Sequence, residues 1–357
     1  MKKTKSNKAY KILFSILSLT VLFLLGCSLL QKRMEAQIPN PISATDLKLN
    51  TVVTVTIYDS DDTAILDDCM ALCDKYEKIF SRTDEGSELY RLNHRLLSPV
   101  SGTDDTYELS EPLAELLSIG LSYSQACQGA FDITIAPLTS LWDFTAQTPL
   151  VPDEEDILTA LASCGYENVV LKGQLITLPS PDTQFDLGGI AKGYIADRLK
   201  EYLLSRQVKS ALINLGGNVL CVGEKINNTP FKIGVQKPFA QRGENLLTVS
   251  VKDKSVVSSG TYERYFEKDG VLYHHILNPQ TGYHYENDLA AVTIISDHSA
   301  DGDALSTACF ALGLEKGLAF AESQSDVQAI FVTKDNEIYY TRDFESKVHA
   351  EKSEQRQ

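Results

Sequence analysis

The sequence predicts an α+β fold in which mixed or antiparallel sheets are flanked by helices. Two observations favour this class. Short segments rich in β-branched residues follow one another through turns, as in hairpins, and helical patterns are interspersed without strict alternation of strand and helix. The 357 residues show no repeat of fixed period and no break in composition after the first 45. We therefore expect one compact unit of two intimate lobes over 46–345.

The first half of this unit begins with a strand over 51–58, which is dense in β-branched residues. Residues 63–80 carry apolar side chains at helical spacing and predict a helix. Ser110 is a suitable N-cap and Pro112 is tolerated in a first helical turn, so another helix begins there. This half is also expected to contain helices at 87–93 and 153–164 and an apolar-alternating segment at 171–178.

The second half contains more strands than helices. An amphipathic run over 190–204 and an Ala-rich run over 300–312, ended by Gly313, predict helices. Residues 346–357 are charged and poor in apolar residues, so we expect a disordered tail. Strands are predicted at 210–215, 231–235, 246–257, 289–295, 329–332 and 337–340.

The N-terminus has the pattern of a targeting segment. Five lysines within residues 2–11 precede an apolar stretch over 12–25, which is short for a membrane span of roughly 20 residues. Gly26 directly before Cys27 resembles the lipobox of bacterial lipoproteins. That resemblance implies a signal peptide over 1–26, a diacylglyceryl-modified Cys27 and a tether over 27–45. The protein is then anchored to the cell membrane on its extracytoplasmic side. A plain signal peptide or an uncleaved anchor is the alternative.

Charge and cysteine content exclude some kinds of partner. The net charge of −15 and the lack of a basic stripe argue against nucleic acid. The sequence has no Cys-x-x-Cys pair and no histidine cluster, so a zinc site is not expected. Beyond Cys27, we interpret the six cysteines as buried free thiols.

The central segment of the unit is 185–197, where the sequence predicts a strand, a Gly-Gly turn and a helix. Glycines at such a junction let the backbone approach a ligand, and the helix start directs free N–H groups at an anion. Asp186 precedes the turn and Lys192 follows it, which suits a phosphate ester carried with a divalent metal. A tight turn with a solvated Lys and Asp is the structural alternative.

Other residues could contribute to the same chemistry. Asp303 and Thr307 are four apart on a helix and share one face, so they offer oxygen ligands to Mg²⁺. An N-cap Asp followed by an ordinary helical Thr is the alternative. His275 at a strand end could accept a proton, and His274 should face the other side. Phe131 and Asp132 could contact a ring, or could simply begin a strand.

Five segments in order make the sequence resemble the ApbE family of FAD:protein FMN transferases. They are Gly-Ala-Phe-Asp-Ile-Thr at 129–134, Asp-Leu-Gly-Gly-Ile-Ala-Lys-Gly-Tyr at 186–194, Asn-Leu-Gly-Gly-Asn at 214–218, His-Ile-Leu-Asn-Pro-Gln-Thr-Gly at 275–282 and Asp-Ala-Leu-Ser-Thr-Ala at 303–308. The resemblance implies an enzyme that uses Mg²⁺ to split FAD. It transfers FMN through a phosphoester to a Thr or Ser of an acceptor flavoprotein of extracytoplasmic electron transfer, and releases AMP.

The resemblance also implies roles for individual residues. Asp303, Thr307 and the carbonyl of Gly189 would bind Mg²⁺, and His275 would be the base that deprotonates the acceptor hydroxyl. Residues implied in FAD binding are Leu49, Thr83, Ala130, Phe131, Asp132, Asp186, Lys192 and Leu277. Two positions depart from the family pattern. Leu49-Asn50 stands where many members have Met-Gly, and an aromatic expected near Thr83 is missing.

Two other functions are compatible with the same residues. One is hydrolysis of FAD to FMN and AMP, with water as the acceptor. The other is a non-catalytic FAD-binding surface lipoprotein, which would keep its affinity for FAD when Asp303 is removed.

Overall fold

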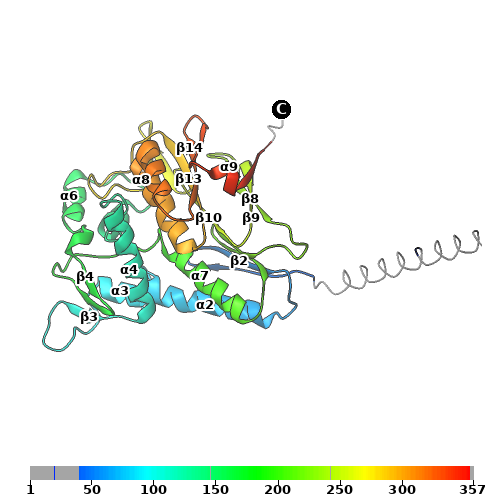
Figure 1. Cartoon of the computed structure of the whole chain (residues 1–357). Helices are drawn as coiled ribbons and strands as arrows, with labels where there is room; N and C mark the ends of the chain where they lie inside the picture. The colour runs from blue at the N-terminus through cyan, green and yellow to red at the C-terminus, as the bar shows by residue number, and fades with distance from the viewer. Residues whose placement is uncertain (1–19, 21–39, 145, 242, 354–357) are drawn as a thin grey trace, which may run out of the picture.

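The computed structural model describes residues 20, 40–144, 146–241 and 243–353. Cys27, most of the tether and all but residue 20 of the predicted signal peptide lie outside these residues. An antiparallel sheet of eight strands forms the centre of the fold, in the order β1-β2-β6-β7-β10-β13-β14-β15 (Figure 1). The α+β prediction is therefore confirmed. The strands are β1 Ile42–Lys48, β2 Thr51–Ile57, β6 Ser210–Leu215, β7 Asn218–Gly223, β10 Ser255–Gly260, β13 Leu289–Ser296, β14 Gln328–Thr333 and β15 Ile338–Tyr340.

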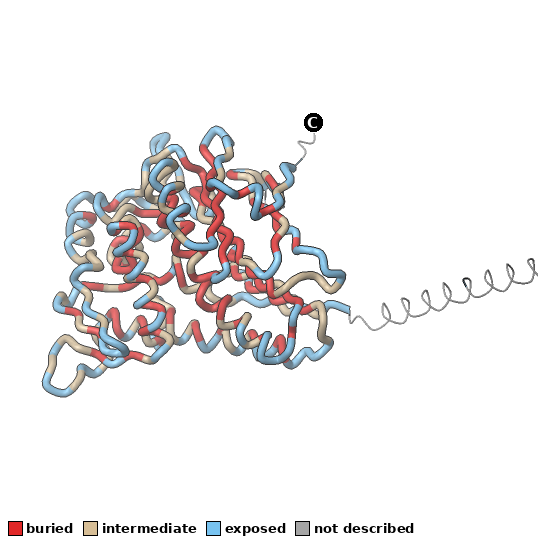
Figure 2. Tube along the Cα trace, viewed as in Figure 1, coloured by how far each residue is buried: buried red, intermediate tan, exposed pale blue. Residues whose placement is uncertain are grey.

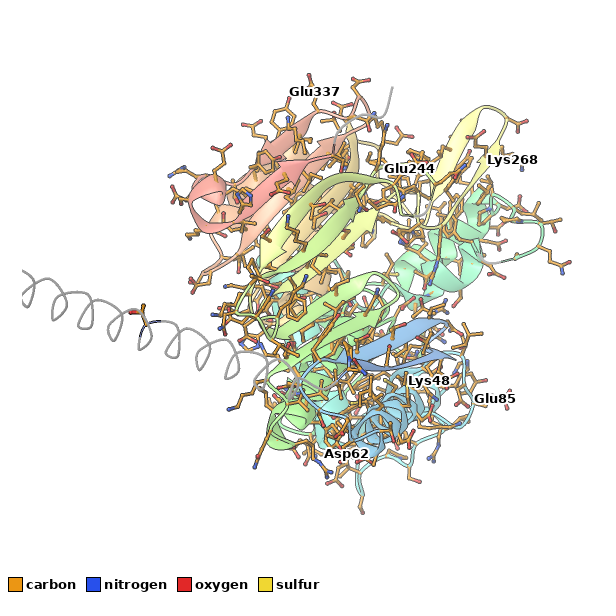
Figure 3. All side chains as sticks on the ribbon, turned by 90° about the vertical axis from the view of Figure 1, so that its right-hand side faces the viewer. Lys48, Asp62, Glu85, Glu244, Lys268 and Glu337 are labelled. Atoms are coloured by element: carbon orange, nitrogen blue, oxygen red, sulfur yellow. The ribbon has the colours of Figure 1, made fainter. Side chains whose placement is uncertain are left out.

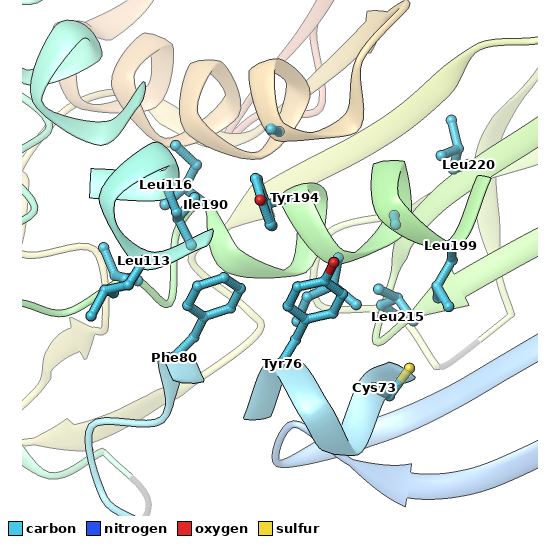
Figure 4. Packing of buried hydrophobic residues seen from close by; sticks show 14 of the residues in the cluster. Cys73, Tyr76, Phe80, Leu113, Leu116, Ile190, Tyr194, Leu199, Leu215 and Leu220 are labelled. Atoms are coloured by element: carbon cyan, nitrogen blue, oxygen red, sulfur yellow. The ribbon is translucent and has the colours of Figure 1, made fainter. Parts of the chain in front are cut away.

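Helices cover one face of this sheet. Apolar residues of α2, α4 and α7 form a common core with β2 and β6, and Figure 4 shows Tyr76, Phe80 and Tyr194 meeting within it. Helix α8 packs on β13 and β14 through Leu305 and Phe310. The helices are α2 Ala64–Phe80, α3 Glu88–Asn93, α4 Glu111–Ala126, α5 Ala136–Trp142, α6 Glu154–Ala162, α7 Ala191–Ser205, α8 Ser299–Glu322 and α9 Phe344–Lys347, with a 3-10 turn at Tyr166–Asn168.

A smaller sheet covers the opposite face. Strands β8 (Phe231–Gln236), β9 (Asn245–Val251) and β16 (His349–Lys352) pack against side chains of β10, β13 and β14. Because helices lie on one face and this sheet on the other, every residue of β13 and β14 is buried. In Figure 2 the buried residues run through the sheet and the inner sides of the helices, and exposed residues lie mostly on the outside.

Two small antiparallel units complete the described fold. Strands β3 (Thr106–Glu108), β5 (Leu175–Thr177) and β4 (Val170–Lys172) form a three-stranded sheet. Strands β11 (Tyr265–Lys268) and β12 (Val271–His274) form a hairpin. The only tryptophan, Trp142 on α5, packs at a tilt against Phe266 and Tyr273 of this hairpin and donates a 2.8 Å hydrogen bond to Gly282 O.

Helix α8 is the one described helix that is long and apolar enough to cross a membrane. Its packing on β13 and β14 explains the apolar composition, because a core helix passes the same test. Gly313 interrupts it with a φ of 76°, as the sequence predicted. Its start is capped from α7, where the two oxygens of Asp197 accept the N–H groups of Ser299 (2.8 Å) and Ala300 (2.9 Å).

Several boundaries differ from the predictions. Residues 42–45, predicted as tether, belong to β1, which pairs with β2 through a turn at Leu49-Asn50. The strand predicted at 246–257 is divided into β9 and β10 by a turn at Asp253, whose φ is 52°. The disordered tail predicted from 346 is wrong for 346–347, which belong to α9, and for 349–352, where β16 pairs with β9. Composition did not reveal this strand because its side chains are mostly exposed.

Charged side chains are distributed over the surface of the described chain. Figure 3 shows examples from separate elements, including Lys48, Glu85 and Glu337. The described cysteines are free thiols, and all but the partly buried Cys164 are buried, in accord with the prediction. Burial raises the pKa of Cys69 and Cys73 to about 12, which makes them unreactive at neutral pH.

Candidate active site

The Gly-Gly bend is fixed by hydrogen bonds to Phe185 and Asp186, which come shortly before it. Asn93 donates to Phe185 O (2.9 Å) and accepts from Phe185 N (2.8 Å), while Asp186 N bonds to Ile133 O (2.8 Å). Asp186 Oδ1 then accepts the N–H of Gly188 at 2.8 Å. These hydrogen bonds therefore hold the backbone in place where it enters α7.

Gly189 is required for close approach rather than for an unusual φ. A Cβ at this position would lie 3.0 Å from Phe131 Cε2 and 3.7 Å from Thr307 Oγ1. The bend of one segment, the aromatic ring of another and the Thr of α8 thus meet at one point. This convergence was expected from the sequence.

Asp303 reaches the first turn of α7. Its Oδ2 accepts the backbone N–H of Gly193 at 3.0 Å and lies 3.3 Å from Lys192 Nζ. Lys192 Nζ also donates to Gly188 O at 2.8 Å. Gly193 makes this arrangement possible, because a Cβ there would be only 2.2 Å from Ser299 O on α8.

Thr307 lies one helical turn after Asp303. Its hydroxyl is 3.1 Å from Ser259 Oγ of β10, and that serine also contacts Ser306 Oγ at 2.8 Å. Ser259 was not singled out from the sequence, because its partners lie 47 and 48 residues away.

The donors around the bend fit a hard cation. They are a carboxylate, a hydroxyl and backbone carbonyls, the oxygen ligands that Mg²⁺ accepts. Among the residues that the structure describes, no cluster of three His, Cys, Asp or Glu side chains offers a metal site. A cation at the bend would therefore have few protein ligands, and water and substrate oxygens would complete its coordination shell. Lys192 now balances the charge of Asp303.

Asp186 is held by residues that sequence reasoning missed. Its Oδ2 accepts from Thr139 Oγ1 at 2.7 Å and lies 3.0 Å from Arg82 Nε. Arg82 follows α2 and Thr139 is on α5, so neither is near Asp186 in the sequence. A lone arginine in a polar loop gave no signal of this contact.

Thr83 lies beside Arg82 in the wall of a pocket of about 290 Å³. The pocket is open to solvent next to the Asp186 network. Its remaining lining residues are Tyr90, Asn93, His94, Ala136, Ser140 and Gln184.

The other residues predicted to bind FAD differ in which of their polar groups already have hydrogen-bond partners. Both oxygens of buried Asp132 are occupied, one by Thr134 N and Oγ1 and one by Tyr166 N, and burial raises its pKa. The carboxylate thus has a structural role in this state. Ala130 O accepts a 2.9 Å hydrogen bond from Tyr285 Oη.

Leu277 and Leu49 are placed by the core. The Leu277 side chain is buried with Leu138, Trp142 and Ile157, which leaves backbone groups as its means of contacting a ligand. Leu49 is the first turn residue of the β1–β2 hairpin, and its N–H donates to Glu77 of α2 at 3.2 Å.

His275 is partly exposed and attached to the β11–β12 hairpin. Its backbone N–H and its Nδ1 contact Arg264 O at 3.1 and 3.3 Å. A carbonyl only accepts, so this contact favours the proton on Nδ1 and leaves Nε2 as an acceptor. Burial and then the charge of Arg264 lower the pKa of His275 to about 4, so the ring is neutral at pH 7.

His274 has a different environment, as its alternation predicted. It is buried against Phe310 and its Nε2 lies 3.1 Å from Tyr285 O. Burial and then His284 lower its pKa to about 3. His274 is therefore a core histidine.

Comparison with known proteins decides the family. The profile described as the ApbE family matches residues 49–331, which is most of the chain. The chain belongs to the ApbE family. Among its relatives, the FAD:protein FMN transferase of Klebsiella pneumoniae (strain 342) is 40% identical over 293 residues, covering 81% of this chain and 88% of the relative. That of Treponema pallidum (strain Nichols) is 32% identical, covering 83% and 85%.

Solved structures of ApbE proteins have the same fold. The ApbE protein of Thermotoga maritima has a TM-score of 0.77 and 30% identity, covering 86% of this chain and 99% of its own. The flavin transferase ApbE of Vibrio cholerae has a TM-score of 0.76, covering 86% and 99%; at 24% identity this likeness concerns the fold alone.

Proposed function

We propose that this ApbE-family chain is a flavin transferase that moves FMN from FAD to a Thr or Ser hydroxyl of an acceptor protein. The bond formed joins the hydroxyl oxygen to the FMN phosphorus, and the bond broken is the one to the bridging oxygen, which leaves with AMP. The observation that carries this proposal is the meeting of Asp303, Lys192 and Thr307 at the Gly188-Gly189 bend. The names of the relatives supply the reaction.

The residues at the bend suit an anionic substrate. Lys192 provides a positive charge at the start of α7. The backbone N–H groups of Ala191 and Gly193 in that turn already donate to Leu187 O (2.8 Å) and Asp303 Oδ2 (3.0 Å). Asp303, Thr307 and the Gly189 carbonyl would hold Mg²⁺, which when bound supplies neutralisation of the phosphate charge. A chain with a net charge of −15 needs such local positive charge to bind a dinucleotide.

His275 suits the role of proton acceptor. Its pKa of about 4 keeps it neutral at physiological pH, and the contact with Arg264 O leaves Nε2 free to accept from the acceptor hydroxyl. Proton transfer by a placed base contributes about 10²–10⁴-fold to rate.

We also propose that the enzyme is a lipoprotein attached through Cys27, facing outward, with an acceptor in extracytoplasmic electron transfer. The support is the Gly26-Cys27 pattern after a short apolar stretch. Expression of wild type and Cys27→Ser in the source cells tests this. Wild type should fractionate with membranes and be cut by external protease, and Cys27→Ser should not be lipid-modified. Cytoplasmic wild type would contradict the proposal.

Co-expression with a candidate acceptor tests the transfer itself. The acceptor should gain the mass of FMN less one water, on a Thr or Ser identified by peptide mapping. His275→Ala should abolish this gain. EDTA should abolish it in purified components, and full turnover in EDTA would contradict the metal role.

A further inference from the structure

Arg82 connects three parts of the chain at the edge of the site. Its Nε lies 3.0 Å from Asp186 Oδ2, and its Nη1 donates to Ser140 Oγ of α5 at 2.8 Å. The Arg82 and Asp186 side chains are 29% and 17% exposed, so water screens this pair less than a pair on the surface. The loop after α2, helix α5 and the Gly-Gly bend therefore meet through this one side chain.

The contact fixes the orientation of the Asp186 carboxylate. One oxygen accepts from Gly188 N, and the other accepts from Thr139 Oγ1 and lies against Arg82. An ion pair at this distance adds an electrostatic attraction that neutral donors do not supply. Without Arg82 the carboxylate loses its charged partner and keeps only neutral donors.

The loop that carries Arg82 does not depend on this ion pair. Ser87 Oγ donates to Ser81 O, and Ser81 Oγ accepts from Thr83 N (3.3 Å) and Asp84 N (3.1 Å). On the exposed side, Lys78 in the last turn of α2 pairs with Asp84 of this loop at 2.6 Å. Removing the Arg82 side chain should therefore leave the loop backbone in place.

We propose that Arg82 is a positioning residue for FAD binding, acting through Asp186. The inference rests on the proposed function and on the FAD contact that the family resemblance implies for Asp186. Arg82 holds the carboxylate in the orientation that also accepts from Gly188, and so fixes both the ligand contact and the bend. Lysine can supply the charge but cannot contact Asp186 and Ser140 as a planar fork does.

A double-mutant cycle in FAD affinity tests this. The variants are Arg82→Ala, Asp186→Asn, both together, and Arg82→Lys. The control is Lys78→Ala, which removes a cation from the last turn of α2, one helical turn before Arg82. FAD binding is measured by quenching of flavin fluorescence in EDTA, where no turnover occurs, and thermal unfolding checks the fold. Arg82→Ala should weaken FAD binding about tenfold, about 1.4 kcal/mol. Arg82→Lys should recover part of this, and Lys78→Ala should match wild type.

Comparing the effect of Arg82→Ala in the wild-type protein and in the Asp186→Asn protein tells whether Arg82 acts through Asp186. In the Asp186→Asn protein, Arg82→Ala should change FAD affinity by less than about twofold, because its partner is already altered. An equal loss in both backgrounds would overturn the inference, since Arg82 would then contact FAD directly. So would an unchanged affinity in Arg82→Ala. FAD binding without acceptor modification in wild type would instead overturn the proposed function and leave this inference standing.

Discussion

At the level of single residues, the charged side chains of the site are already paired with one another. Asp303 is paired with Lys192, and Asp186 with Arg82, before any ligand is present. The sequence predicted Asp303, Thr307 and Gly189 because each lies within a short recognisable segment. It did not predict Arg82 or Ser259, since their contacts join residues far apart in the chain.

Asp303→Asn should weaken Mg²⁺ binding in the presence of FAD by at least about tenfold, because it removes the charge of the carboxylate that reaches the bend from α8. Calorimetric titration of Mg²⁺ measures this. Asp301→Asn is the matched control, since it removes the same charge from the same helix, where Asp301 accepts from Tyr123 Oη instead. Equal effects of the two variants would show that Asp303 acts on Mg²⁺ affinity only through its charge and not as a ligand.

His274 should make the fold sensitive to acid. Its pKa is about 3 in the folded chain, so between about pH 6.5 and 3 the unfolded chain binds a proton that the folded chain does not. Stability is therefore lost as pH falls through this window. The groups that act on this ring are His284, His275 and Lys334.

His274→Asn should lose less stability than wild type between pH 7 and pH 5, by about 2 kcal/mol. Urea unfolding at both pH values measures this, and exposed His349→Asn serves as the control. An identical acid slope in wild type and His274→Asn would contradict the burial argument.

At the element scale, the crossing of α7 and α8 builds the site. Gly193 lets the helices touch, Asp197 of α7 caps α8, and Asp303 of α8 accepts from the first turn of α7. The two helices were predicted from their periodicity. Their crossing was not, because it depends on a single small residue and on caps supplied from another helix.

Gly193→Ala should destabilise the fold by about 1–3 kcal/mol, since the added methyl would lie 2.2 Å from Ser299 O. It should also reduce Mg²⁺ affinity, because Asp303 moves with α8. Denaturant unfolding and metal titration measure the two effects. Glu201→Ala, on the exposed face of α7, should change neither; an unaffected Gly193→Ala would show that the crossing tolerates more space than the structure has.

At the scale of the whole molecule, one antiparallel sheet brings distant segments to a single site. Strand β2 pairs with β6, although more than 150 residues separate them, and β7 pairs with β10. Local signals predicted most strands and the α+β class. The strand order could not be predicted, because pairings between distant segments leave no local pattern, and β16 was missed because its side chains are mostly exposed.

The most direct measurement follows AMP and acceptor mass together in one reaction of purified enzyme, FAD, Mg²⁺ and acceptor. One AMP should be released for each FMN attached to an acceptor Thr or Ser, and AMP should not be released rapidly when the acceptor is omitted. Rapid AMP release without any gain in acceptor mass would contradict the proposed transfer, because the same residues would then direct water at FAD.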